Sequence, residues 1–443
     1  MTTHFRHQIG LVLLTGLLLM TIGIQPVESA TDLVFTVNST ADLNDFVINS
    51  VCSVGAITGG PCTLRAAIDE ANWNGVYGNV TINIPANTYD LTIPPDGIND
   101  IKSGDLDFPK ANPLYTIKLV GTGTQPTVID ANQLDRVFEI SLDVNVQMEN
   151  IVIKGGLLSW TGSADYADGA GILNYGNLLL TEVVIEENEV RCGQETCAFQ
   201  IAGGGIQNGG KIYMADSIIR NNSSVGASAI FNSGAMGSFF ITNSTIYDNH
   251  ASEAFVIDNY ANLHIRNSTI SGNTAAPAYI AGIRNNNTLI LESSTIANAG
   301  RISSIYNPPG SSVTIHDSIL RNTPQGGSDN CSNSGTWTSQ GYNIYSDNTC
   351  PATGTGDQVN TDPMLGTLGG WGGSTLTMPL LVGSPARDNR PGNCTKIPEN
   401  PVLPIEDLAE DQRHYLRSDG NCDTGAFEGV VDIRTVFLPI LFR

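Results

Sequence analysis

Three charged residues, Lys154, Glu186 and Arg220, occupy the same position in successive segments of a repeated pattern. A polysaccharide lyase needs a basic side chain to remove a proton next to a carboxyl group, and carboxylates to hold Ca²⁺. An acid between two bases would be a residue set for that reaction. The same three residues would also form an inert ion-pair stripe on the surface, which is the commoner outcome. We therefore assign no catalytic residues and keep these three as the alternative.

The remaining acids and histidines suggest little further chemistry. Glu186, Glu187 and Glu189 would hold Ca²⁺ if they converged, but a solvated charged corner explains them equally well. Asp105 and Asp107 are expected to shape a turn. A glycoside hydrolase needs two facing carboxylates, and none of the columns that can be placed has two in adjacent repeats. His264 and His316 are predicted to lie too far apart to form a catalytic pair.

A second column favours binding. Tyr213, Phe240, His264 and Ile290 each stand four places before the same point of the repeat. An exposed aromatic stripe would suit sugar rings or a partner surface. The alternative is that a loop covers the column, because monomers rarely leave such patches bare.

A repeat from Gly169 to Thr323 must position these columns. In it, Ile is followed two places later by Asn at 172/174, 206/208, 230/232, 257/259, 283/285 and 305/307. A serine recurs at positions 217, 244, 268, 294 and 318, so the steps are 27, 24, 26 and 24 residues. A period of this length is typical of a solenoid.

The local pattern within each repeat is that of strands. Apolar residues lie two apart, in short segments rich in Ile, Val and Thr, and no window shows a helical stripe. The sequence therefore predicts an all-β fold, a parallel β-helix with one coil per repeat and Asn and Ser ladders at its corners. Residues 80–328 form the β-helix, with Ile246 in the core and Thr245 on the outside.

Composition limits the possible partners. The chain has 443 residues, 47 glycines and a formal net charge of −22. Such a charge repels nucleic acid and anionic membrane surfaces. It also disfavours acidic pectin-like substrates unless Ca²⁺ bridges them. We expect a monomer that needs no cofactor, apart from Ca²⁺ in that case.

Residues 1–30 are predicted to be an export signal, with a basic start and an apolar run from Ile9 to Ile24. An uncleaved anchor is the alternative for this segment, and no later segment is long or apolar enough to span a membrane.

The cysteines fall into four sequence-local couples, as expected in an oxidising compartment. The proposed pairs, from proximity alone, are Cys52–Cys62, Cys192–Cys197, Cys331–Cys350 and Cys394–Cys422. The cysteines and histidines lack zinc-type spacing, so no metal site is predicted from them.

Residues 31–79 differ from the repeats and include one predicted helix, from Cys62 to Asn72, with Thr63 as its cap. One apolar face would cover the open end of the solenoid. The segment Cys-Thr-Leu-Arg-Ala-Ala-Ile-Asp-Glu-Ala-Asn at 62–72 resembles the motif of CSLREA-domain proteins, which are secreted bacterial proteins. The repeats are similar to the pectin-lyase-like β-helix. This resemblance, with the usual hand of parallel crossovers, implies a right-handed solenoid.

Residues 329–430 lose the period and resemble the choice-of-anchor Q domain of bacterial surface proteins. The resemblance rests on short motifs such as Asp362-Pro363, Gly383-Ser384-Pro385-Ala386 and 422–428. Met378 and His414 depart from that family's pattern. The apolar tail 431–443 is either a sorting signal or a last strand.

Two functions remain for an extracellular or cell-surface protein of this kind. The first is non-catalytic binding of a polysaccharide or a cell-surface protein. The second is a polysaccharide lyase or glycoside hydrolase, because fold alone does not decide activity. The missing column of paired carboxylates favours binding.

Overall fold

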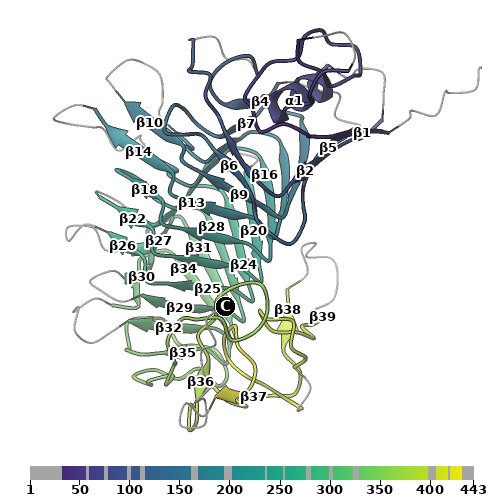
Figure 1. The fold of residues 1–443 in the computed structure, drawn as a ribbon. Helices are drawn as coiled ribbons and strands as arrows, with labels where there is room; N and C mark the ends of the chain where they lie inside the picture. The colour runs from purple at the N-terminus through teal and green to yellow at the C-terminus, as the bar shows by residue number, and fades with distance from the viewer. Residues whose placement is uncertain are drawn as a thin grey trace, which may run out of the picture.

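The structure is a computed structural model that describes residues 32–55, 59–73, 78–96, 101–109, 115–160, 168–193, 202–234, 237–252, 255–275, 281–298, 303–322, 329–397, 406–417 and 420–431. The predicted export signal, and all but the first residue of the predicted tail, lie outside these ranges. Short parallel strands stacked coil on coil dominate the described chain (Figure 1). No helix in the described part is long and apolar enough to span a bilayer.

Sheet A is the longest of the stacked sheets. All its strands are parallel, and it contains, in spatial order, β1 (Leu33–Thr36), β2 (Val80–Pro85), β5 (Thr116–Thr122), β8 (Asn145–Glu149), β12 (Asn177–Thr181), β16 (Lys211–Ala215), β20 (Ser238–Thr242), β24 (Asn262–Arg266), β28 (Thr288–Glu292), β31 (Ser312–His316) and β34 (Thr336–Gly341).

Sheets B and C run alongside it, also with parallel strands throughout. Sheet B contains β3 (Thr88–Asp90), β6 (Thr127–Asp130), β9 (Ile151–Lys154), β13 (Val184–Glu186), β17 (Ile218–Arg220), β21 (Thr245–Tyr247), β25 (Thr269–Ser271), β29 (Thr295–Asn298), β32 (Ile319–Asn322) and β35 (Ile344–Tyr345). Sheet C contains β4 (Leu106–Phe108), β7 (Phe138–Ile140), β11 (Ile172–Asn174), β15 (Ile206–Asn208), β19 (Ile230–Asn232), β23 (Ile257–Asn259), β27 (Ala281–Asn285), β30 (Ser303–Asn307) and β33 (Cys331–Asn333).

A fourth, shorter sheet D completes the middle coils. It contains β10 (Leu157–Trp160), β14 (Glu189–Cys192), β18 (Ser223–Ser224), β22 (His250–Ala251) and β26 (Thr274–Ala275). One coil therefore passes through sheets C, A, B and D before the next begins, and each strand pairs with its equivalent one coil away. The predicted all-β parallel β-helix is confirmed.

The core lies inside the coils. The apolar residue of each Ile-x-Asn pair is fully buried, and Ile246 is 1% exposed. These side chains form one continuous cluster from Phe35 to Cys350. The strands β33, β34 and β35 carry the three sheets to Tyr345, so the last coil lies inside the range 329–430 that the sequence assigns to the C-terminal module.

Side-chain ladders satisfy the corners, as predicted. Each asparagine of the Ile-x-Asn pairs donates from Nδ2 to Oδ1 of its equivalent on the next coil, at 2.7–2.9 Å, from Asn174 through to Asn333. The recurrent serines accept from the backbone of the preceding coil, as in Ser217 N to Ser244 Oγ at 3.1 Å. The residue before each of these serines has positive φ. Two ladders thus replace the backbone partners that turns would otherwise lack.

The helix α1 (Leu64–Asn72) covers the N-terminal end, as predicted. Thr63 Oγ1 accepts from Ala66 N at 3.2 Å, so Thr63 is the N-cap. The apolar face, including Ile68, joins the core. Arg65 is almost completely buried and pairs with Asp42 at 2.6 Å. The cap is therefore held by a buried ion pair as well as by apolar contacts.

Three of the four predicted disulfides are confirmed, namely Cys52–Cys62, Cys331–Cys350 and Cys394–Cys422. Cys192 is also disulfide-bonded, and its predicted partner Cys197 lies outside the described residues. These bonds indicate that the protein folds in an oxidising environment.

The C-terminal module packs on the outer face of sheet B, and Figure 1 shows its yellow segment beside strands of that sheet. Its own strands are short: β36 (Leu380–Leu381) with β41 (Val430–Val431), β37 (Arg390–Pro391) with β40 (Asn421–Cys422), and β38 (Thr395–Lys396) with β39 (Glu406–Asp407). A second apolar cluster joins the module to outward-facing residues of sheet B, such as Ala297 and Ile319.

The module corrects the prediction that Thr245 lies on the outside. Thr245 points away from the core, but its exposed fraction is zero. Its hydroxyl donates to Leu376 O at 2.6 Å and accepts from Gln412 Nε2 at 3.0 Å. The repeat register was right, and the error was to treat an outward side chain as exposed.

Candidate functional site

The predicted aromatic column lies on the outer face of sheet A. Tyr213, Phe240, His264 and Ile290 are register partners on four consecutive strands. The rings of Tyr213 and Phe240 stack with centroids 4.8 Å apart and planes 4° apart. Phe240 and His264 follow at 5.7 Å with a 54° tilt. Parallel strands alone place these rings one coil apart, because equivalent residues face the same way.

A groove follows this column. One depression is lined by Tyr213, Phe240, His264, Arg266 and residues next to them such as Thr242, and it does not reach Ile290. A second depression runs over the preceding coils, from β16 back to β5, and shares Tyr213, with Leu179 beside it. Tyr213 is 40% exposed and Leu179 36%. In the described part of the chain, therefore, the column is not fully covered, which the sequence alone could not decide.

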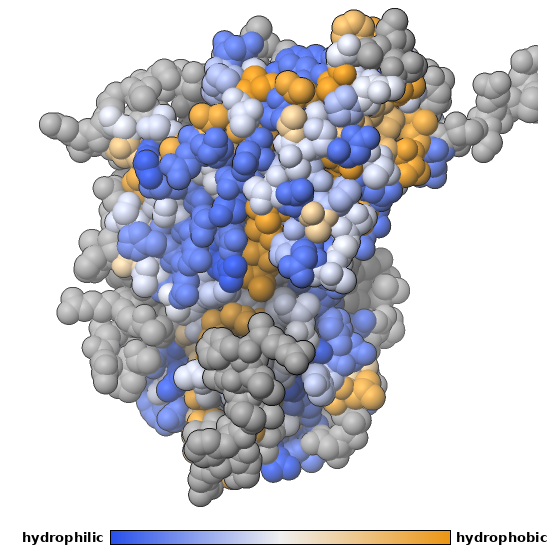
Figure 2. All heavy atoms as spheres, viewed as in Figure 1, coloured by the Kyte–Doolittle hydropathy of each residue, from blue (hydrophilic) through white to orange (hydrophobic). Residues whose placement is uncertain are grey.

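Much of the protein surface is polar, with narrow hydrophobic areas between the polar ones (Figure 2). Figure 2 shows one face of the molecule, where hydrophobic residues form a narrow strip within a largely hydrophilic area. The groove has the same character at its far end, where Thr242 and Arg266 line it next to the rings. Aromatic faces with polar groups beside them are what a sugar ring requires, because its faces are apolar and its edges carry hydroxyls.

The charged column is an ion-pair stripe. Lys154, Glu186 and Arg220 are register partners on β9, β13 and β17, as predicted. Arg220 Nε lies 2.5 Å from Glu186 Oε2, and Lys154 Nζ lies 2.8 Å from Glu187 Oε2. The hydrogen bond with Glu187 raises the pKa of Lys154. Burial alone would lower the pKa of Arg220, but hydrogen bonds to Tyr247 and Glu186 raise it. Both side chains are held as cations, whereas a catalytic base must give up its proton near the working pH.

The structure brings together an acidic cluster that the sequence interpretation missed. Asp107 lies within strand β4 and pairs in register with Glu139 on β7, so the prediction that Asp107 shapes a turn is wrong. Two carboxylates do occupy one column in adjacent coils. The signal was the alternation in Leu106-Asp107-Phe108 and Phe138-Glu139-Ile140. It was overlooked because these first coils lack the asparagine that marks the later ones.

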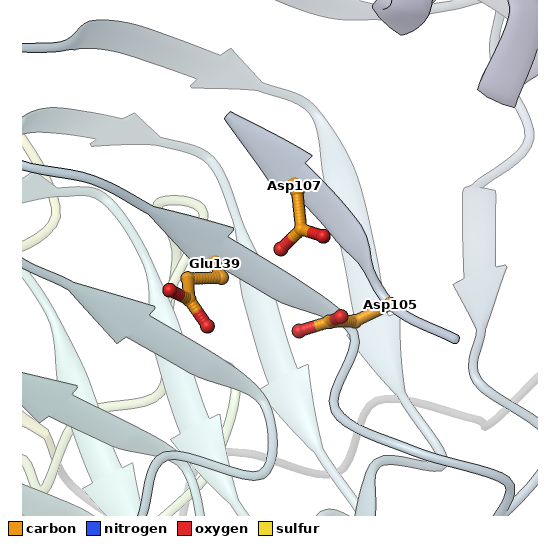
Figure 3. A group of neighbouring side chains, drawn as sticks. All are labelled: Asp105, Asp107 and Glu139. Atoms are coloured by element: carbon orange, nitrogen blue, oxygen red, sulfur yellow. The ribbon is translucent and has the colours of Figure 1, made fainter. Parts of the chain in front are cut away.

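The acidic cluster consists of Asp105, Asp107 and Glu139, with Arg136 at its side (Figure 3). Arg136 Nη1 lies 2.9 Å from Asp105 Oδ2 and 2.7 Å from Glu139 Oε2. Asp107 is 4% exposed, and within the described part of the chain neither of its carboxylate oxygens has a hydrogen-bond partner. Burial, followed by the nearby charges of Asp105 and Glu139, raises the pKa of Asp107 to about 8. Burial also raises the pKa of Asp105 to about 6, although Arg136 opposes the shift.

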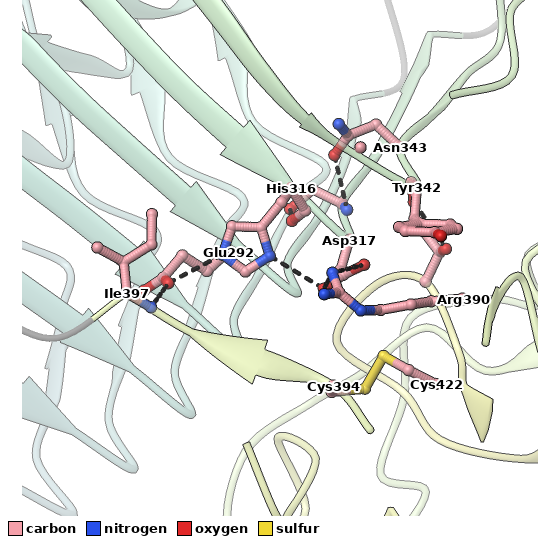
Figure 4. A network of polar contacts seen from close by, with 12 residues as sticks. Glu292, His316, Asp317, Tyr342, Asn343, Arg390, Cys394, Ile397 and Cys422 are labelled. Carbon is pink, nitrogen blue, oxygen red and sulfur yellow. Dashed lines mark hydrogen bonds and ion pairs between the residues drawn. A yellow bond between two sulfur atoms is a disulfide. The ribbon is translucent and has the colours of Figure 1, made fainter. Parts of the chain in front are cut away.

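A second buried charge network lies where the C-terminal module meets the coils (Figure 4). Glu292 contacts His264 Nε2, His316 Nε2 at 3.0 Å and Arg266 Nε at 2.9 Å, and it accepts from the backbone N–H of Ile397. For these two histidines the sequence predicted only that they lie too far apart to form a catalytic pair. They lie two coils apart, and Glu292 on the coil between them joins both.

This network continues into the C-terminal module. His316 Nδ1 lies 3.0 Å from Asp317 Oδ2, and Asp317 accepts from Arg390 at 2.9 Å. Burial alone would lower the pKa of His316, but hydrogen bonds to Asp317 and Glu292 raise it to about 9. Burial alone would raise the pKa of Glu292, but the two histidines hold it well below its usual range. Oppositely charged side chains are paired here, so this network fixes the C-terminal module to the coils.

The sequence matches no model of a known protein family and no curated protein.

Proposed function

We propose that this protein binds a glycan chain along the groove on sheet A. The observation that carries the proposal is the stacked pair of Tyr213 and Phe240, which lies in a depression beside the polar groups of Arg266 and Thr242. Carbohydrate rings stack on such aromatic faces, and the polar groups fix their orientation. A continuous sheet supplies a rigid support for both.

The groups lining the groove favour binding over hydrolysis. A hydrolase needs two carboxylates that reach the scissile bond. Of the residues that the structure describes, no Asp or Glu lines either depression of the groove. The nearest acid behind His264 is Glu292, which is fully buried and paired. A lyase at Lys154, Glu186 and Arg220 has no more support, because these residues neutralise one another and their neighbours.

The setting of the proposal is extracellular. We propose a secreted or cell-surface protein that acts as a monomer on an extracellular polysaccharide or a glycosylated cell-surface partner. The disulfides and the acidic composition support this. Relationship to CSLREA-domain and choice-of-anchor Q proteins is part of the same proposal, and rests on the motifs at 62–72 and 362–428.

A glycan array on the protein, followed by calorimetric titration of any glycan that binds, tests the proposal. Tyr213→Ala should lower the affinity about tenfold, because one stacked ring contributes roughly 0.5–1.5 kcal/mol beyond its buried area. Tyr260→Ala is the matched control, since Tyr260 is similarly exposed, at 44%, but does not line the groove. The proposal fails if no glycan binds, or if both variants bind as the parent does.

A further inference from the structure

We propose that Asp105, Asp107 and Glu139 form a binding site for a divalent cation that prefers oxygen ligands, with Ca²⁺ as the expected ion. This site is separate from the groove, because it lies on the outer face of sheet C at the N-terminal end of the solenoid. It does not depend on glycan binding.

The spacing of the three carboxylates suits such an ion. One oxygen from each residue lies within 4.8 Å of the others. Ca²⁺ takes oxygen ligands at about 2.3–2.6 Å, so ligands on opposite sides of the ion lie up to about 5 Å apart. An ion placed between the three carboxylates would reach all of them without rearrangement of the strands.

The environment of Asp107 is the observation that points to a bound cation. It is buried, both of its oxygens lack a hydrogen-bond partner among the residues that the structure describes, and Figure 3 shows the carboxylate pointing toward the space between Glu139 and Asp105. A buried carboxylate without a partner is costly, and proteins retain such groups where something else completes them. Asp258 lies in the same column of sheet C and is also buried, but it is fully paired with Arg284.

The charge of the cluster also matches. With all three carboxylates ionised, as a bound cation requires, they and the Arg136 guanidinium carry a net charge of −2, which one divalent cation would neutralise. Arg136 contacts one oxygen of Asp105 and one of Glu139, whereas the described residues offer no hydrogen-bond partner to Asp107. The guanidinium therefore neutralises part of the cluster and leaves Asp107 as the acid that still needs a cation.

The cap helix holds the ligand backbone in place. Arg65 donates to the carbonyls of Gly104 and Asp105 at 2.8 and 3.0 Å. Asn72 Nδ2 donates to the carbonyl of Asp107 at 2.7 Å. Both donors come from the segment 62–72. This segment thus fixes the strand that presents two of the three carboxylates, and a preformed site binds an ion at less cost.

Burial favours an ion over a saccharide as the ligand. Asp105 and Asp107 are 5% and 4% exposed. A sugar ring would have to displace the surrounding structure to bring a glycosidic bond to these oxygens, whereas an ion needs only the space between them. Ca²⁺ is preferred over Mg²⁺ because Mg²⁺ demands near-ideal octahedral geometry and retains its waters.

The test compares thermal unfolding and calorimetric titration of the chelator-treated protein with CaCl₂ and MgCl₂. We expect Ca²⁺ to bind with one-to-one stoichiometry at this site and to raise the melting temperature by several degrees at saturation, with a smaller shift for Mg²⁺. Asp107→Asn and Glu139→Gln should each weaken Ca²⁺ binding at least tenfold and remove most of the shift. Asp258→Asn should keep it.

The proposal is overturned if the parent protein shows neither heat nor a melting shift with Ca²⁺. It is also overturned if the shift survives unchanged in Asp107→Asn or Glu139→Gln. Failure of one variant to fold leaves the other, because the two residues lie on different strands and Glu139→Gln keeps the volume of the side chain. Measuring glycan binding with the same samples tests the groove independently, so failure of the cation site and failure of the glycan site can be told apart.

Discussion

Two buried carboxylates at opposite parts of the solenoid, Asp107 and Glu292, have nearly the same exposure and opposite environments. Asp107 is 4% exposed and Glu292 is fully buried. Glu292 is surrounded by two histidines, Arg266 and a backbone N–H, whereas Asp107 has no hydrogen-bond partner in the described ranges. The pKa of Asp107 rises to about 8, and the pKa of Glu292 falls.

The difference shows that burial does not by itself say what an acid is for. All partners of Glu292 come from the chain itself, including Ile397 of the C-terminal module, so Glu292 completes a joint between two parts of the protein. The two carboxylate oxygens of Asp107 find no hydrogen-bond partner in the described chain. A group of that kind is either a defect or a site, and the convergence of Asp105 and Glu139 on it favours a site.

The largest effect is expected from Glu292→Ala. It leaves His264 and His316 buried, and Arg266 partly buried, without their common partner, and breaking a buried ion pair on one side costs about 3–5 kcal/mol. Urea unfolding followed by circular dichroism would show this loss of stability. Protease sensitivity should rise first in the C-terminal module, because Glu292 accepts from the Ile397 N–H.

Glu149→Ala is the matched control for that variant. Glu149 is also the last residue of a sheet A strand, but its side chain is 43% exposed, and its ion pair in the described structure is with Lys118 on the surface. Exposed pairs contribute little. If both alanine variants unfolded at the same urea concentration, the partners around Glu292 would not be stabilising, and the contrast with Asp107 would lose its meaning.

Alkaline pH should weaken the same joint by a smaller amount. The folded-state pKa of His316 is about 9, above its ordinary value of 6.5, so the folded protein binds more protons than the unfolded chain between these values. Its contribution is therefore complete below pH 6.5 and lost as pH rises through 9. The difference between these two pKa values corresponds to about 3 kcal/mol. The groups that face His316 are Glu292, Asp317 and, through Asp317, Arg390.

Stability measured by urea unfolding from pH 6 to pH 10 tests this expectation. His316→Gln should be less stable at pH 6 and should lose most of the slope between pH 7 and 9.5. His250→Gln is the control, because His250 is exposed and its ring contacts only Thr274 among the described residues. A slope that is equally steep in His316→Gln would assign the alkaline loss to other groups.

The sequence predicted the parts that depend on repetition. The Ile-x-Asn pairs and the serine ladder gave the coil, its register and the outward columns, because one rule acts on every repeat. The parts it missed depend on contacts across long separations. Thr245 is covered by Gln412, more than 160 residues away, and Glu292 meets Ile397. The acidic cluster was missed for another reason, since Asp107 and Glu139 lie in coils that lack the marker asparagine.

The smallest and most discriminating effect is expected from Asp107→Asn. Without Ca²⁺, the variant should be more stable than the parent by about 1 kcal/mol. The change removes a buried group that cannot be ionised without a partner, and the new amide can donate to the neighbouring carboxylates. Asp258→Asn, in the same column but paired with Arg284, should instead lose stability. Urea unfolding in chelator gives the sign of the stability change for both variants.

With saturating Ca²⁺ the order of stability of the parent and Asp107→Asn should reverse, because only the parent gains binding energy from the ion. If Asp107→Asn lost stability in chelator as Asp258→Asn does, Asp107 would have a partner within the chain, and the two buried acids would differ in degree and not in kind.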